Sequence, residues 1–281
     1  MATPTIDKVT TSWQAGAEGY AAAFEPWSTP VAIQLALAVG AHHCSSLIEV
    51  GAGTGAAAAF VQSVRSPASL ADGTFRHSVS DLVAPFVAQL KHRLSPHTDV
   101  TIANGERLSH EADCTYAAYM SCLCLMITPD PNAMLTEAFR VLKPGGVAGF
   151  AVWGSKDQSP MMAIPPESLR ACGFVPAPKR SNFHLGSQDE SALRAAVFAA
   201  GFSSMHAWRV HAVLPGGSDP QRYIELMKEG SPSFGALLEP LQQAEREQAL
   251  AEMRRRAAEV LDRGEAIGCD VLLFLAYKAA A

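Results

Sequence analysis

Short apolar segments alternate with amphipathic segments between residues 31 and 154. Apolar positions at helical spacing predict helices over 31–39, 56–64, 84–94 and 131–142. Short apolar runs predict strands over 47–50, 75–80, 100–103, 116–120 and 147–152. Strands that alternate with helices in this way predict an α/β fold, in which helices cover both faces of a mostly parallel sheet.

The first predicted strand runs into a glycine-rich turn, in the segment S-L-I-E-V-G-A-G-T-G-A at 46–56. Glycine has no Cβ and accepts positive φ, so Gly51, Gly53 and Gly55 let the backbone approach a ligand closely. The turn has two interpretations. As G-x-G-x-x-A it would bind the pyrophosphate of a dinucleotide. As E-x-G-x-G-x-G it would be the nucleoside loop of a methyl-donor site.

Polar residues follow the next predicted strands, at the sheet edge where ligands of such folds bind. Asp81 ends the second strand, and its carboxylate could hold two ribose hydroxyls or cap the next helix. Asn104, Gly105 and Glu106 follow the third strand. The Asn104 oxygen could accept from an adenine amino group, although Asn-Gly is also a common turn. Ser121 follows the fourth strand, and this order of groups is hard to obtain by chance.

Composition and charge narrow the class of protein. Of the 281 residues, 48% are hydrophobic and 17% are charged, which is typical of a globular chain rather than a disordered one. The net charge of −5 disfavours nucleic acid as a partner. No secretory signal and no apolar run of membrane-spanning length are visible, so we expect a cytoplasmic protein.

The six cysteines show no paired metal-binding spacing. We therefore expect reduced thiols and no metal site. Cys122 and Cys124 lie two positions apart at the end of a predicted strand, and we expect their side chains to point to opposite sides. His42 and His43 lie beside Cys44, but no further metal ligand can be placed with them.

Five segments resemble the motifs of class I S-adenosylmethionine-dependent methyltransferases of the small-molecule group. They are I-E-V-G-A-G-T-G at 48–55, V-S-D-L at 79–82, A-N-G-E-R-L at 103–108, T-Y-A-A-Y-M-S at 115–121 and D-P-N-A-M-L-T-E-A-F-R-V-L-K-P-G-G at 130–146. The first and the last are the most specific. The dinucleotide interpretation gives no role to L-K-P-G-G or A-N-G-E, so the resemblance favours the methyl-donor interpretation.

The resemblance implies a doubly wound, Rossmann-like sheet of seven strands, whose last strand inserts antiparallel between its neighbours. Two late segments, 206–214 and 270–278, have the strand character that this arrangement needs. The resemblance also implies S-adenosyl-L-methionine as cofactor and S-adenosyl-L-homocysteine as product. The cofactor-binding residues that it implies are Tyr20, Glu49, Gly51, Ala52, Gly53, Gly55, Asp81, Leu82, Asn104, Gly105, Glu106 and Ser121.

The same resemblance implies a role for several of these side chains. Asp81 would bind the ribose, and Asn104 with Gly105 would bind the adenine. Glu49 would orient the glycine turn or the amino end of the methionine moiety. Tyr20 lies where the family often has an aromatic residue against the cofactor, although it could also be a buried aromatic of the first helix. The transfer would be an in-line displacement, for which the protein supplies alignment and water exclusion.

The chain departs from the family pattern in three places, and two of them, Asn104 and Ala117, leave a second function class open. Asn104 stands where the family has an acid, although its side-chain oxygen still accepts a hydrogen bond. Ala117 stands where the family often has an aspartate, and the segment between Gly55 and Asp81 is longer than usual. The alternative is a non-catalytic member of the same fold that binds only a nucleoside or a partner protein.

We expect a single methyltransferase domain over 1–281, with N-terminal helices in 1–40 and the cofactor-binding core in 45–154. The segments 155–186 and 215–265 are long insertions, and such insertions in compact domains are usually functional. We expect them to form a helical lid that binds the acceptor.

The acceptor is expected to be an apolar small molecule. S-C-L-C follows the fourth strand, where amide or adenine N-methyltransferases of this fold carry an N-P-P-Y-type run. The lid side chains expected to face the methyl group are Met161, Met162, Phe183 and Met227. His184 and His110 are candidates for a general base, which is needed only if the acceptor must lose a proton.

Overall fold

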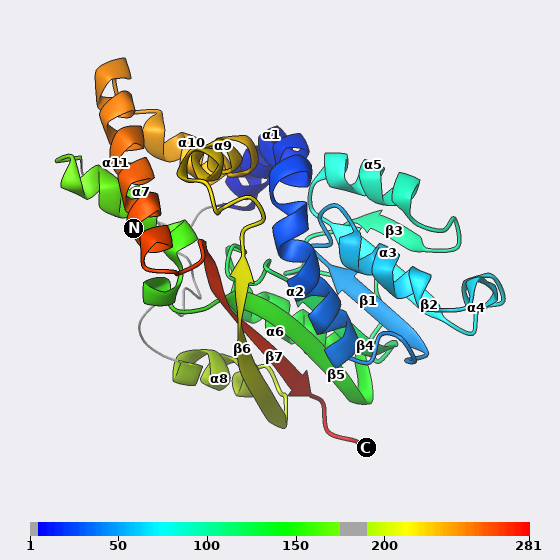
Figure 1. The fold of residues 1–281 in the computed structure, drawn as a ribbon. Coiled ribbons are helices and arrows are strands. Elements are labelled where there is room, and N and C mark those ends of the chain that lie inside the picture. The colour runs from blue at the N-terminus through cyan, green and yellow to red at the C-terminus, as the bar shows by residue number, and fades with distance from the viewer. Residues whose placement is uncertain (1–4, 175–189) are drawn as a thin grey trace.

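The computed structural model describes residues 5–174 and 190–281. Seven strands form one sheet in the order β3-β2-β1-β4-β5-β7-β6 (Figure 1). The strands are β1 Ser46–Val50, β2 Arg76–Asp81, β3 Asp99–Ile102, β4 Tyr116–Cys122, β5 Leu142–Trp153, β6 Ser204–Val213 and β7 Gly268–Tyr277. Strands β1 to β5 pair in parallel, and β7 runs antiparallel between β5 and β6. The predicted fold class and the inserted antiparallel strand are therefore confirmed.

Helices cover both faces of the sheet. They are α1 Ile6–Ala23, α2 Glu25–Ala38, α3 Ala56–Ser63, α4 Pro67–Ala71, α5 Ala84–Arg93, α6 Pro131–Val141, α7 Pro160–Ala171, α8 Glu190–Ala199, α9 Pro220–Gly230, α10 Pro232–Leu238 and α11 Gln243–Asp262, with a short 3₁₀ helix, η1 Lys156–Gln158, before α7. Successive strand residues point to opposite faces. Leu47 of β1 accordingly packs with α2 and α3, whereas Ile48 packs with α6 and α8.

The boundary between α6 and β5 differs from the prediction in one respect. The helix begins as expected, because the Asp130 side chain accepts from the backbone N–H of Ala133 and Pro131 occupies the first turn. The following L-K-P-G-G segment is not a free turn. Leu142 already pairs with Tyr116 of β4, and the register then shifts, so that this segment forms an irregular start of β5.

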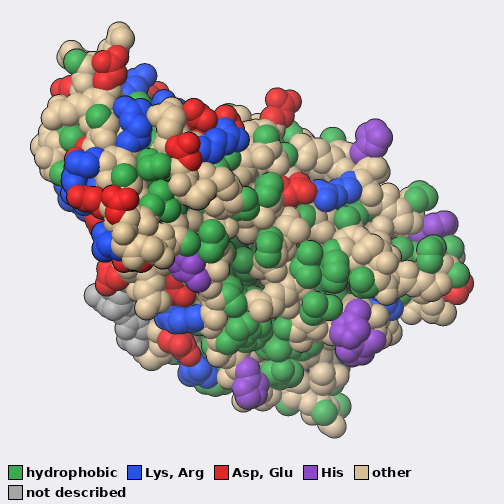
Figure 2. Space-filling model, in the orientation of Figure 1, with side chains coloured by type: hydrophobic (Ala, Val, Ile, Leu, Met, Phe, Trp, Pro, Cys, Tyr) green, Lys and Arg blue, Asp and Glu red, His purple; other side chains and the backbone are tan. Residues whose placement is uncertain are grey.

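The segments after β5 and β6 build a helical layer at one end of the molecule (Figure 1). Apolar residues of α7, α9, α10 and α11 join the core that also contains α2. The Tyr223 hydroxyl of α9 donates to the carbonyl oxygen of Met161 in α7 at 3.0 Å. Figure 2 shows charged side chains of both signs gathered over this layer, where Glu252 pairs with Arg255 and Arg256. None of the described helices combines the length and apolar character that a membrane span needs.

Helix α1 lies in close contact with α9. A Cβ atom added to Gly19 of α1 would lie 1.8 Å from the backbone oxygen of Glu229. At the neighbouring position of α9, a Cβ added to Gly230 would lie 2.1 Å from Cδ2 of Phe24, the residue that follows α1. The two helices can therefore approach this closely only because both positions are glycine.

We expect Gly19→Ala to lower the free energy of unfolding by about 1–3 kcal/mol, because backbone atoms of α9 leave no room for the added methyl group. Gly235→Ala in α10 is the matched control, since no atom lies within 4 Å of its added Cβ. That control should raise the free energy of unfolding by no more than about 1 kcal/mol, because alanine has a higher helix propensity than glycine. Chemical denaturation of both variants measures the difference. Equal stabilities would contradict the close α1–α9 contact.

Candidate active site

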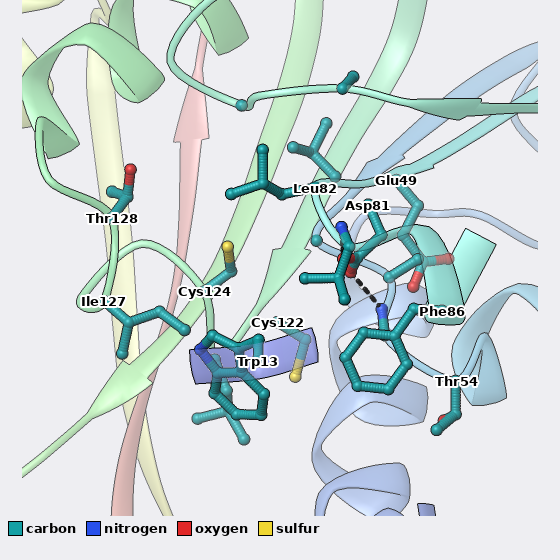
Figure 3. A pocket seen from close by; sticks show the side chains of 18 of the residues that line it. Trp13, Glu49, Thr54, Asp81, Leu82, Phe86, Cys122, Cys124, Ile127 and Thr128 are labelled. Atoms are coloured by element: carbon teal, nitrogen blue, oxygen red, sulfur yellow. Dashed lines mark hydrogen bonds between the residues drawn. The ribbon is translucent and has the colours of Figure 1, made fainter. Parts of the chain in front are cut away.

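A cleft opens at the carboxyl ends of β1, β2 and β4, and α1 and α2 cover it (Figure 3). It holds about 1040 Å³, counting the part that is open to solvent. Most of the predicted cofactor-binding residues line it. These are Tyr20, Glu49, Gly51, Ala52, Gly53, Asp81, Leu82, Asn104 and Gly105. The sheet therefore brings together side chains from four separate segments of the sequence, as the α/β architecture predicts.

Asp81 fixes the glycine turn to the end of β2. Its Oδ2 accepts from the backbone N–H of Gly53 at 2.8 Å, and its Oδ1 accepts from the N–H of Val83 at 2.9 Å. Burial raises the pKa of Asp81, and hydrogen bonds from backbone amides oppose that rise. The N-cap of α5 is Val83, so the alternative of Asp81 as a helix cap is wrong. Asp81 instead joins two loops at the floor of the cleft.

The three glycines of the turn serve different purposes. All three have positive φ: 71° at Gly51, 55° at Gly53 and 79° at Gly55. A Cβ on Gly51 would lie 2.6 Å from Sγ of Cys124, and one on Gly55 would lie 2.4 Å from Cδ2 of Leu90. A Cβ on Gly53 would meet nothing within 4 Å. Gly51 and Gly55 therefore allow close packing of Cys124 and Leu90 against the turn, whereas Gly53 leaves bare backbone facing open space. Gly55 does not line the cleft.

Glu49 is the least satisfied polar group of the site. Its side chain is buried, with 3% of the residue surface exposed, and its Oε2 has no hydrogen-bond partner. Burial, with a further contribution from the Asp81 carboxylate, raises the pKa of Glu49 from 4.5 to about 8. Glu49 is therefore largely neutral at pH 7 in the absence of a ligand. A buried oxygen without a donor costs free energy, and such groups concentrate at functional sites.

The loop after β3 is held by its own side chains. Asn104 Oδ1 accepts from the backbone N–H of Glu106 at 3.0 Å, which is the turn geometry that an Asn-Gly pair favours. The Glu106 carboxylate accepts from the Thr128 hydroxyl and from the N–H of Asp130, each at 2.6 Å. Asn104 and Gly105 line the cleft, but Glu106 does not. Glu106 therefore ties two loops together at the edge of the site.

The end of β4 places two thiols in the cleft. Leu123 adopts a left-handed conformation with φ of 54°, and both Cys122 and Cys124 line the cleft. The expectation that these side chains point to opposite sides is therefore wrong, because residues two positions apart on a strand point to the same face. Burial raises the pKa of both thiols, that of Cys124 to about 12, so both are neutral. Ser121 is fully buried and does not line the cleft.

Aromatic rings from α1 and α5 form one wall of the cleft. The ring centroids of Trp13 and Tyr20 lie 5.5 Å apart, and Phe86 lies 6.4 Å from Trp13 and 6.0 Å from Tyr20. The Tyr20 hydroxyl donates to Ser28 Oγ at 3.1 Å, and burial raises its pKa to about 12. Trp13 and Phe86 were not among the predicted site residues. Trp13 could have been found, because a spacing of seven residues places it on the same helix face as Tyr20.

Other predicted residues do not reach the cleft. His110 lies 3.3 Å from Thr101 Oγ1 and 3.7 Å from Glu111, and it does not line the site. Met161 and Met227 are buried in the core, and Met162 packs against that core. His184 and Phe183 lie outside the described residues. Within the described parts of 155–186 and 215–265, no residue lines the cleft, so α1 and α2 supply its cover.

Comparison with known proteins identifies the central part of the chain. Residues 47–146 match the sequence family described as a methyltransferase domain. This segment is a methyltransferase domain. It contains nearly all of β1, all of β2 to β4 and most of the cleft-lining residues, from Glu49 to Met134. The resemblance to class I methyltransferases is therefore confirmed, as is the expectation that the family uses S-adenosylmethionine.

Solved structures share the fold over most or all of this chain. The [4+2]-cyclase SpnF has a TM-score of 0.57 at 15% identity, with 100% of this chain and 98% of that chain covered. A methyltransferase from Thermotoga maritima has a TM-score of 0.54 at 12% identity, with coverages of 95% and 99%. The YcgJ protein of Bacillus has a TM-score of 0.53 at 14% identity, with coverages of 88% and 98%. No curated protein sequence matches this chain.

The methyltransferase domain thus has an unusual titratable group, Glu49, on its first strand. The effect of Glu49 on stability can be measured. The pKa of Glu49 is higher in the folded chain than in the unfolded one. Its contribution to stability is therefore fully present below about pH 4.5 and is lost as the pH rises through about 8.

We expect Glu49→Gln, which replaces a neutral carboxyl by an amide of the same shape, to stabilise the ligand-free protein at about pH 9 relative to wild type. The gain should be on the order of a few kcal/mol at that pH and should shrink toward about pH 5. Denaturation of both proteins across this range measures the difference, in which the contributions of all other groups cancel. Parallel stability curves would show that Glu49 does not titrate as its burial requires.

Proposed function

We propose that this protein is an S-adenosylmethionine-dependent methyltransferase that acts on a small, largely apolar acceptor. The observation that carries the proposal is the cleft of the methyltransferase domain. There, bare backbone at Gly53, the Asp81 carboxylate and the unpartnered Glu49 oxygen converge beneath an aromatic wall. This combination supplies surface for a flat, apolar base and acceptors for polar groups of a ligand.

The residues present fit this cofactor. The open space at Gly53 allows a nucleoside to lie against the backbone, and a side chain there would fill it. Asp81 is well placed for the ribose, because only part of the hydrogen-bonding capacity of its two oxygens is used by Gly53 and Val83. Asn104 and Gly105 would lie at the adenine, with Leu82 and Met134 as apolar walls. Glu49 would face the charged methionine end.

When bound, the cofactor supplies a methyl group activated by a positively charged sulfur, which a nucleophile of the acceptor can take by direct displacement. The protein's own contribution is to hold and shield the reactants. Helix α1 lines the cleft with Ile6, Val9 and Trp13, whose apolar surface would shield the reactants from water. The contact of α1 with α9 fixes the position of that cover. The segment 215–265, which contains α9, would then hold α1 in place over the cleft.

The nature of the wall supports a small, apolar acceptor. The covering residues Ile6, Val9 and Trp13 present hydrocarbon and an indole ring, and Ile127 and Pro129 add apolar surface from the loop after β4. A nucleic-acid acceptor would require a basic surface around the cleft. The net charge of the chain is −5.

The non-catalytic alternative has less support. Ala117, one of the two departures that favour it, lies near the beginning of β4 and does not line the cleft. An aspartate at that position would be remote from the ligand. The other departure, Asn104, keeps its place at the cleft.

Turnover tests the proposal. The protein is incubated with S-adenosylmethionine and a panel of apolar amines, phenols and thiols, and mass spectrometry detects S-adenosylhomocysteine and methylated product in equal amounts. Gly53→Val should weaken cofactor binding by at least about tenfold, which corresponds to ~1.4 kcal/mol. The reason is that its side chain would occupy the open space at the turn.

Gly73→Val is the matched control. Gly73 has φ of 76° and, like Gly53, no atom within 4 Å of an added Cβ, so both variants carry comparable backbone strain. Gly73→Val should bind the cofactor like wild type. Near-native affinity in a folded Gly53→Val protein would contradict the site. Cofactor binding without turnover on any acceptor would favour the non-catalytic alternative.

A further inference from the structure

The cleft contains two carboxyl groups and no basic side chain among its described residues. Asp81 of β2 and Glu49 of β1 lie at the same corner, beside the glycine turn (Figure 3). Arg93 of the neighbouring helix α5 is paired with Glu25 at 2.9 Å and donates to the Thr54 carbonyl at 3.2 Å. A ligand that brings positive charge into the cleft would therefore find acceptors that the protein itself leaves without a counter-ion.

The two carboxyl groups are not equivalent. Asp81 receives backbone N–H groups at both oxygens, which stabilise its ionised form. Glu49 Oε2 receives none, although only 3% of the residue surface remains exposed to solvent. An unpartnered carboxyl in this position is best kept neutral by a proton. Glu49 is therefore the group whose charge a ligand can change.

The other titratable groups that face Glu49 do not change charge in its place. The thiols of Cys122 and Cys124, from β4, are neutral because burial raises the pKa of each. The Tyr20 phenol, from α1, is also neutral, since its pKa is raised to about 12. Helices α2 and α3 place no charged side chain in the cleft lining. Among the residues that the structure describes, Asp81 is the group whose charge acts on Glu49, and that charge favours the protonated form of Glu49.

We propose that Glu49 recognises the positive charge of the methyl donor by exchanging its own proton for that charge. This inference rests on the proposed function, because it takes S-adenosylmethionine as the ligand. In the free protein Glu49 is a carboxylic acid. On binding, the O–H bond of Glu49 breaks, the proton leaves to solvent and the carboxylate pairs with the cation. The charge of the buried site is thereby unchanged, and the cost of burying an isolated ion is avoided.

The donor offers two cations, the sulfonium and the α-ammonium group, and the product retains only the ammonium. If Glu49 pairs with the sulfonium, loss of the methyl group removes its partner, and Glu49 would regain a proton as the product leaves. If Glu49 pairs with the ammonium, donor and product would release the proton alike. In both cases Glu49 exchanges its proton for a cation of the ligand, and a neutral nucleoside has no such cation.

Titration calorimetry in buffers of different ionisation enthalpy counts the protons released on binding. At about pH 7, wild-type protein should release close to one proton per S-adenosylmethionine, because a carboxyl with a pKa of about 8 is mostly protonated there. Affinity should increase about tenfold per pH unit between roughly pH 6 and 7.5. Adenosine should release no proton. Proton release on binding of S-adenosylhomocysteine would show that Glu49 pairs with the ammonium group. No proton release with this ligand would show that Glu49 pairs with the sulfonium.

Two variants complete the test. Glu49→Gln should bind S-adenosylmethionine more weakly at about pH 7.5, without proton release and without pH dependence over this range. Glu25→Gln removes a neighbouring carboxylate that does not line the cleft, and it should behave like wild type. Circular dichroism confirms that both variants are folded.

The outcomes separate this inference from the proposed function. Binding of S-adenosylmethionine to wild type without proton release would overturn the inference alone, as would equal release by Glu49→Gln or release on binding of adenosine. Failure of wild type to bind any of the three ligands would overturn the proposed function and the inference together.

Discussion

The hydrogen bond from the Gly53 amide to the Asp81 carboxylate connects the two strand ends on which the cleft depends. It is reinforced from the same strand, because the carbonyl of Ser80 accepts from the N–H groups of Gly51 and Ala52. A carboxylate buried at this position would be costly without such donors. With them, Asp81 holds the turn in a left-handed conformation that leaves the backbone of Gly53 exposed to the cleft.

The consequence of this arrangement is an uneven distribution of donors. The N–H groups of Gly51 and Ala52 are donated to Ser80 and that of Gly53 to Asp81, whereas Glu49 Oε2 receives no donor. The protein therefore carries one satisfied and one unsatisfied carboxyl within a single cleft. Stability alone would favour a residue with no buried polar atom at position 49, so the free energy lost there indicates a requirement of function.

Much of the fold could be predicted from the sequence because its signals are local. The apolar runs of β1 and β4, the cap at Asp130 and the alternation of strand and helix each depend on near neighbours in the chain. The location of Asp81 and Asn104 at one edge followed from the parallel topology. The place of Gly53 at the cleft could also be predicted, because three glycines within five residues after a strand are typical of a turn that brings its backbone close to a ligand.

The remainder depended on contacts between distant residues. Nothing near Leu123 in the sequence predicts its left-handed conformation between two thiols that line the cleft. The partners of Glu106 are distant in the chain, at Thr128 and Asp130. The cover of the cleft was expected from the two insertions, yet among the described residues α1 and α2 line it and the insertions do not. The amphipathic pattern of α1 does not reveal which surface it contacts.

In the proposed function, Asp81 organises a nucleoside site as well as the turn. The most direct measurement of this role is the dissociation constant of S-adenosylmethionine for Asp81→Ala, obtained by calorimetry on protein that circular dichroism shows to be folded. A charge-assisted hydrogen bond contributes roughly 1.5–3 kcal/mol, so we expect affinity at least about tenfold weaker than wild type. An unchanged dissociation constant would contradict the nucleoside site and would leave Asp81 with a role in the turn alone.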